Sequence, residues 1–254
     1  RIYIGHIPVY GAAALTGVGV TMPAIMIISA FAALVSAGGA PRVSMLMGKG
    51  ENEQAEKVMG NCFTLLVGLS ILLTVVISIW DRDLLLLFGA SENTVGYAEE
   101  YMRIYTLGTL FVQLTLGMNA FITAQGFAKV SMLTVLIGAL CNIVLDPLFI
   151  FVFDLGVQGA AIATVLSQAV SAVWVMLFIT GKKCVLRLKL RNLRVQPRLV
   201  APCILLGLSP FVMQSTESVL SICFNASLLK YGGDIAVGAM TVLSSIMQFA
   251  MMPL

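Results

Sequence analysis

The stretch that decides the fold reads CNIVLDPLFIF, from Cys141 to Phe151. It lies within residues 130–153, a run apolar enough to cross a membrane, which takes about 20 mainly apolar residues. This run nevertheless holds an amide, Asn142, and a carboxylate, Asp146, which is followed by Pro147. A carboxylate inside a membrane span is costly and is therefore a candidate for function by default.

The whole chain has the composition of an integral membrane protein. Of its 254 residues, 59% are hydrophobic and 11% are charged, whereas soluble domains carry about 25% charged residues. The apolar runs are too long for strands and show no alternation, which predicts an all-α, polytopic helical bundle. We expect about seven spans, at residues 16–47, 58–80, 101–123, 130–153, 157–180, 200–229 and 235–254.

The basic residues predict how these spans are oriented. If the connection after the first span is cytoplasmic, eleven Lys and Arg residues fall inside and four fall outside, as the positive-inside rule requires. Residues 181–199, which carry seven basic side chains and no acid, are then a cytoplasmic loop of a multi-pass protein in the inner (plasma) membrane. Arg1 starts outside and is not a methionine, so we expect a fragment that lacks a preceding helix.

A weak internal repeat supports a division of the chain. HIPVYGAAALTGVGVTMPAIM (residues 6–26) resembles DIAVGAMTVLSSIMQFAMMP (residues 234–253). Duplicated transporters carry such repeats in their two halves. We therefore expect residues 1–199 to form one lobe, with 181–199 as its linker, and residues 200–254 to begin a second.

Asn142 and Asp146 share one helix face because they are four residues apart. Pro147 has no N–H and loosens the carbonyl of Ile143, so one turn offers three oxygen ligands to a small cation or a proton. Counted at about 1.5 Å per residue from the outer connection, Asp146 lies about 10 Å deep, Thr164 about 12 Å and Asn142 about 16 Å. The alternative is that the Asp-Pro pair only ends a helix.

Other polar residues within spans are weaker candidates. Glu217 and Gln214 belong to a polar helix face in PFVMQSTESVLSI, which would line a substrate cavity or form a buried hydrogen-bond network. Asn119 is either a cavity residue or a packing hydrogen bond. The fourteen methionines could line an adaptable cavity or fill the core.

Metal and redox chemistry have little support. The five cysteines are not spaced as a metal knuckle or a redox pair, and His6 is the single histidine. We therefore read the cysteines as free thiols and expect no metal site beyond a possible sodium ion at Asp146 and Asn142.

Four segments together resemble a known family. GKGENEQAEKVMGN, ITAQG, IGALCNIVLDPLFIF and GVQGAAIATVLSQ are similar to the multidrug and toxic compound extrusion (MATE) transporters, in their MepA-like bacterial branch. The resemblance covers nearly the whole chain in consistent order. It implies helices two to eight of a twelve-helix transporter with two lobes.

The resemblance also implies a function. Members of the family export cationic lipophilic compounds in exchange for H⁺ or Na⁺ and use no cofactor. Their amino-terminal cation site falls on Asn142, Asp146 and Thr164, with Asn119 as a further polar residue, while the first-helix aspartate of that site would precede Arg1. A seventh-helix glutamate of some members lies near Glu217, although its spacing from Pro210 differs.

Two other functions fit the sequence less well. A lipid-linked oligosaccharide flippase of the same superfamily would need several cationic side chains in its cavity, and the spans are nearly free of Lys and Arg. An intramembrane enzyme would need paired catalytic groups at one depth, which the spans do not offer. We therefore expect a monomeric transporter, not an enzyme, whose partners are small organic cations and the bilayer rather than nucleic acid.

Overall fold

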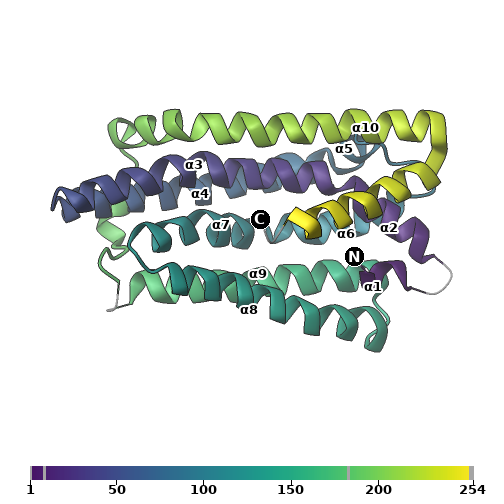
Figure 1. The fold of residues 1–254 in the computed structure, drawn as a ribbon, viewed down its shortest axis with the longest axis horizontal. Helices are drawn as coiled ribbons and strands as arrows, with labels where there is room; N and C mark the ends of the chain where they lie inside the picture. The colour runs from purple at the N-terminus through teal and green to yellow at the C-terminus, as the bar shows by residue number, and fades with distance from the viewer. Residues whose placement is uncertain (1, 8–9, 182–183, 252–254) are drawn as a thin grey trace.

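The structure is a computed structural model that describes residues 2–7, 10–181 and 184–251. The basic residues Arg1, Lys182 and Lys183 and the end of the last predicted span lie outside the described residues. The described residues form helices and no strand, and most helices run along the long axis of one bundle (Figure 1). In chain order the helices are α1 (Ile2–Gly5), α2 (Gly11–Val20), α3 (Met22–Gly48), α4 (Asn52–Ile79), α5 (Asp81–Leu87), α6 (Val95–Leu107), α7 (Thr109–Ala124), α8 (Ala128–Pro147), the π-helix η1 (Leu148–Val152), α9 (Gly156–Thr180), the short η2 (Leu190–Leu193) and α10 (Pro197–Met251).

The predicted spans correspond to these helices with three adjustments. Five helical stretches within the described residues are long and apolar enough to cross a membrane, or six if the bent pair α6–α7 counts as one span. That pair bends by 57° at Gly108, where a methyl group would lie 2.6 Å from Val165 of α9. The first span is interrupted at Thr21, between α2 and α3.

The last two predicted spans form the single assigned helix α10. Gly233 has φ +64° and ψ −167° within it, a conformation that only glycine adopts readily. The chain reverses there, so that α10 has a long first arm beside α3 and a shorter second arm that folds back (Figure 1). The first arm therefore contains the predicted span 200–229, and the second arm contains residues 235–251 of the last predicted span.

The linker before α10 is bound to α4 through polar contacts. Glu56 accepts hydrogen bonds from the Arg187 backbone (3.2 Å) and from Lys189 Nζ (2.6 Å). Thr64 donates to the Leu193 carbonyl, 2.8 Å away. Gln125, the residue directly after α7, accepts from the Leu186 backbone at 2.9 Å. Residues 184–193 are thus held against the bundle.

Candidate functional site

Most residues of helix α8 are exposed or half-buried. Its buried residues are Thr134 and Asp146, while apolar side chains such as Leu140 and Val144 are more than 60% exposed and are suited to face lipid. Asp146 is 8% exposed. The sequence therefore turns its only α8 carboxylate inward, at the end of a helix whose outer surface is apolar.

Asn142 holds this carboxylate from one turn deeper. Its Nδ2 donates to Oδ1 of Asp146 over 3.0 Å, as the spacing of four residues allows. After Pro147 the chain widens into η1, where Phe153 N donates to the Leu148 carbonyl five residues back, at 3.0 Å. Pro147 cannot donate a backbone hydrogen bond, and the wider turn begins directly after it.

Helix α9 supplies the third predicted residue. Gly159 lies so close to η1 that a methyl group there would be 2.6 Å from the Phe149 carbonyl oxygen, so this glycine serves close packing of the two elements. One turn further on, Thr164 Oγ1 donates to the Ala160 carbonyl at 2.9 Å. Its hydroxyl hydrogen is thereby used within α9, and its oxygen lone pairs remain able to accept or to coordinate a cation.

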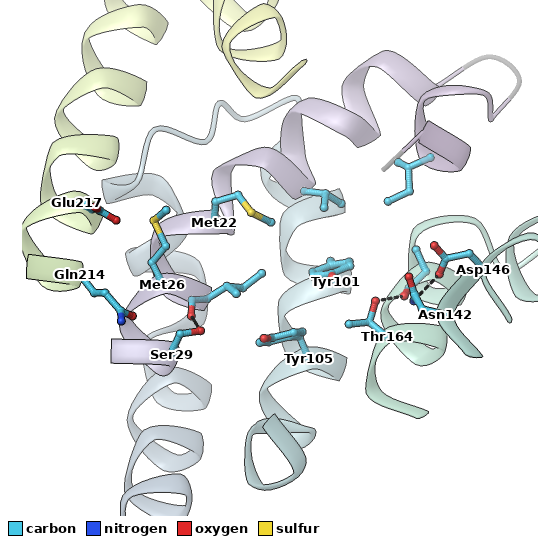
Figure 2. Close-up of a pocket in the computed structure, with 14 residues that line it drawn as sticks. Met22, Met26, Ser29, Tyr101, Tyr105, Asn142, Asp146, Thr164, Gln214 and Glu217 are labelled. Atoms are coloured by element: carbon cyan, nitrogen blue, oxygen red, sulfur yellow. Dashed lines mark hydrogen bonds between the residues drawn. The ribbon is translucent and has the colours of Figure 1, made fainter. Parts of the chain in front are cut away.

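These residues line one cavity of about 430 Å³. Asn142, Asp146 and Thr164 gather on one side of it, and Gln214 and Glu217 of α10 lie on the opposite side (Figure 2). The structure thus brings together five of the six residues singled out in the sequence. Among the described residues that line the cavity the carboxylates are Asp146 and Glu217, with no Lys or Arg, so these side chains favour positive charge.

Asn119 does not line this cavity. Its Nδ2 donates to the Ser131 carbonyl over 3.3 Å, and its amide oxygen is buried without a hydrogen-bond partner. The sequence left two interpretations of Asn119 open, a cavity residue or a packing hydrogen bond. The structure shows the hydrogen bond.

The sequence did not single out the residues between the two polar groups, although it allowed that methionines could line a cavity. Tyr101 and Tyr105 of α6, and Met22, Met26 and Ser29 of α3, lie between them (Figure 2). Within each helix these residues are three or four positions apart, which places them on one helix face. This spacing is the feature of the sequence from which they could have been found. Met22, Met26 and Glu217 also line a second cavity of about 300 Å³ toward Phe224 and Met240.

The cavities contain no evident transition-metal site. Within the described residues, no group of three or more His, Cys, Asp or Glu side chains could hold a metal ion. The carboxylate, amide and hydroxyl oxygens near Asp146 are hard ligands that suit a proton or a small hard cation.

Comparisons with known proteins agree with this architecture. The family model MatE matches residues 1–148. The multidrug export protein MepA of Staphylococcus haemolyticus is 25% identical over 235 residues, which are 92% of this chain and 52% of that protein. The chain therefore spans about half the length of the curated relatives it matches.

Solved structures show the same fold. The structure of the MATE multidrug transporter DinF-BH superposes with a TM-score of 0.92 and 35% identity, over 99% of this chain and 56% of that one. An inward-facing multidrug resistance transporter of the MATE family has a TM-score of 0.90 and 26% identity, over 95% of this chain and 55% of the other.

Proposed function

Because this chain belongs to the MatE family, we propose that it is part of a multidrug efflux antiporter that exports cationic lipophilic compounds in exchange for H⁺ or Na⁺. The observation that carries the proposal is one cavity with two carboxylates, Asp146 and Glu217, on opposite sides and no basic side chain among the described residues that line it. Such a cavity attracts cations and disfavours anionic lipid phosphates, which argues against a flippase.

The coupling ion binds at Asp146 in this proposal. Asn142 holds the carboxylate in place (3.0 Å), and Thr164 offers a hydroxyl oxygen from the neighbouring helix. A proton or a sodium ion at Asp146 removes negative charge from the cavity. A cationic substrate in the same cavity then loses part of its electrostatic attraction, which links ion entry to substrate release.

The substrate occupies the space between the two carboxylates. Tyr101 and Tyr105 offer aromatic faces to an organic cation, Met22 and Met26 offer flexible apolar contacts, and Glu217 offers a charge on the α10 side. Adaptable contacts of this kind suit a site that accepts several chemically different compounds.

We further propose that residues 1–199 form the amino-terminal lobe, with 181–199 as a cytoplasmic linker, and that residues 200–254 begin the second. Reciprocal contacts support this division. Thr16 of α2 and Thr241 of α10 each donate to the carbonyl four residues back, at 2.9 and 3.0 Å. Each also lies against a glycine of the other helix, Gly238 and Gly19 respectively, as equivalent helices of two duplicated halves would.

The decisive experiment replaces Asp146 with Asn in the full-length transporter. Asp146→Asn keeps the shape of the side chain but removes the charge that must be gained and lost. In proteoliposomes under an imposed proton or sodium gradient, we expect the variant to insert normally and to lose gradient-driven dye efflux. Wild-type rates in Asp146→Asn would place the coupling site elsewhere.

Asp154 provides a matched control. It lies eight residues further along the chain, exposed, with φ +52°, and does not line the cavity. Asn tolerates this left-handed conformation well, so Asp154→Asn makes the same chemical change without strain. Efflux should survive in Asp154→Asn, and equal losses in both variants would point to a general effect of charge.

A further inference from the structure

A separate polar cavity lies at the α5 end of the bundle, opposite the end that carries the linker (Figure 1). Its volume is about 310 Å³, and α4, α5 and α6 meet around it. The described residues that line it are Ser78, Asp81, Arg103, Thr106 and Leu107. None of them lines the cavity between Asp146 and Glu217. The proposed exchange of ions and substrate does not involve this second place.

Two residues in the wall of this cavity carry a buried oxygen without a hydrogen-bond partner. Asp81 is 8% exposed and Thr106 is 1% exposed. Within the described residues, neither Asp81 Oδ1 nor Thr106 Oγ1 has a partner. Buried polar atoms are nearly always hydrogen-bonded, and leaving one unpaired costs stability. Two such oxygens at one cavity therefore indicate that a hydrogen-bond donor binds there.

The charges nearby favour a cationic group and leave room for an anionic one. Three acids share two arginines over 3.2 to 3.8 Å, with Arg82 between Glu92 and Glu99, and Arg103 between Asp81 and Glu99. Burial raises the pKa of Asp81 above its ordinary value, and Arg103 offsets this only in part. Both guanidinium groups are more than half exposed, so they can also bind a phosphate.

The cavity lies where the apolar surface of the bundle meets this charged cluster. The span formed by α4 ends at Ile79, and Ile79, Trp80 and Leu107 are all more than half exposed. Tryptophan is enriched at the level of the lipid headgroups. A molecule bound here can keep its apolar part against Ile79 and Leu107 while its polar end occupies the cavity. A membrane lipid has this shape.

We propose that this cavity binds the phosphoethanolamine headgroup of a membrane phospholipid. The ammonium group brings three N–H donors to the Asp81 carboxylate and the Thr106 hydroxyl, and the phosphate pairs with Arg103. The acyl chains extend over the apolar surface beside the cavity. A choline headgroup has no N–H to donate, and a glycerol headgroup has no positive charge, so neither can satisfy the two unpaired oxygens and the acid excess together.

The test measures lipid binding and does not depend on transport. Full-length protein in detergent is freed of lipid, and phosphatidylethanolamine, phosphatidylcholine and phosphatidylglycerol with identical acyl chains are added separately. Native mass spectrometry gives the dissociation constant of the first lipid that binds. Because hydrogen bonds to a charged group are strong, phosphatidylethanolamine should bind about ten-fold more tightly than the other two. Equal affinities for the three lipids would overturn the proposal.

Asp81→Asn should weaken phosphatidylethanolamine binding to the level of phosphatidylcholine. Asp83→Asn is the matched control, because Asp83 lies in the same first turn of α5, is exposed and does not line the cavity. Both variants remove one acid from the same turn. A preference for phosphatidylethanolamine that survives Asp81→Asn, or that is lost equally in Asp83→Asn, would contradict a site at Asp81.

Thr106→Val separates binding from folding. The change keeps the shape of the side chain and removes an oxygen that has no partner, so the lipid-free protein should melt at the same temperature or higher. Phosphatidylethanolamine should nevertheless bind more weakly to Thr106→Val than to the wild type. Unchanged binding would show that the hydroxyl does not contact the headgroup and would overturn the assignment.

Two other results would assign the cavity to a different ligand. Soluble phosphoethanolamine that binds as tightly as the phospholipid would overturn the membrane as the source, because it has no chains to lie against Ile79 and Leu107. Sodium or calcium chloride that raises the melting temperature of the lipid-free wild type, but not of Asp81→Asn, would show a site for a metal cation instead.

Discussion

Asn142 donates an amide hydrogen to Asp146 across one turn of α8, with 3.0 Å between Nδ2 and Oδ1. The carboxylate is thus positioned by its own helix, while Thr164 approaches from α9 and Glu217 from α10. Because these helices and others, including α3 and α6, meet at this cavity, a change in the charge of Asp146 acts on contacts between helices and not only within one. This arrangement is what an ion-coupled change of conformation requires.

Asn142→Ala should change ion coupling without abolishing it. A hydrogen bond to a charged group contributes about 1.5 kcal/mol or more, so a sodium ion, which binds the positioned carboxylate, should bind about ten-fold more weakly. A proton should instead bind more tightly, because the lost hydrogen bond stabilised the ionised carboxylate. The measurement is the proton or sodium concentration at half-maximal dye efflux from proteoliposomes. Asn119→Ala removes the same side chain outside the cavity and should leave this value unchanged; an equal shift in both variants would contradict a specific role for Asn142.

Glu217→Gln should change the substrate profile rather than stop transport. The carboxylate lies opposite Asp146 and lines both cavities, so its charge should matter most for dyes whose cationic group reaches α10. Efflux rates for a panel of cationic dyes should fall unequally. Thr216→Val is the control, since Thr216 donates to Val212 within its own helix (2.8 Å). Equal losses for all dyes together with poor expression would indicate a structural role.

The sequence predicts the spans and the grouping of Asn142, Asp146 and Thr164 because both follow from helix geometry. Hydrophobic length fixes the spans, and a constant rise per residue fixes depth. Helix geometry alone could not place the tyrosines of α6 in the cavity, because their position depends on the bend between α6 and α7. The same holds for Asn119, whose hydrogen-bond partner, Ser131, lies on the next helix.

The linker should be accessible from the cytoplasm. Arg194 is exposed and follows η2, whereas Asn192 packs against Gly60 and is a poorer probe. In a protein with the native cysteines replaced, Arg194→Cys should not react with an impermeant maleimide added to intact cells and should react after permeabilisation. Labelling in intact cells would reverse the predicted orientation.

Cys184 should react with maleimides more slowly than this exposed linker cysteine. Burial raises the pKa of the Cys184 thiol above its ordinary value of 9.0, although hydrogen bonds from nearby backbone groups act in the opposite direction. Only the thiolate reacts, so the labelling rate of Cys184 should still increase as the pH rises beyond 9.0. Labelling that is quenched at a series of times and followed by mass spectrometry gives the rates for Cys184 and for the introduced linker cysteine. Equal rates at every pH would contradict this prediction.

Glu56 is one of the residues that hold the linker to α4. It is 8% exposed and accepts from Lys189 Nζ at 2.6 Å and from the Arg187 backbone at 3.2 Å. Without the Glu56 carboxylate, the donors that bind it lose their acceptor, at a cost of about 1–3 kcal/mol in the free energy of holding the linker. Glu56→Ala should therefore release the linker and raise the rate of tryptic cleavage after Arg187, Lys189 and Arg191 in the folded protein.

Two variants separate this effect from a loss of charge on α4. Glu53→Ala removes an acid one turn earlier, which is 82% exposed and pairs with Lys57 at 2.8 Å, and it should leave cleavage of the linker unchanged. Lys189→Ala removes one of the two contacts, and because Lys189 is 58% exposed its effect on cleavage after Arg187 and Arg191, the sites that remain, should be smaller than that of Glu56→Ala. If Glu53→Ala and Glu56→Ala accelerate cleavage equally, the linker is held by the general charge of α4 and not by the contacts of Glu56.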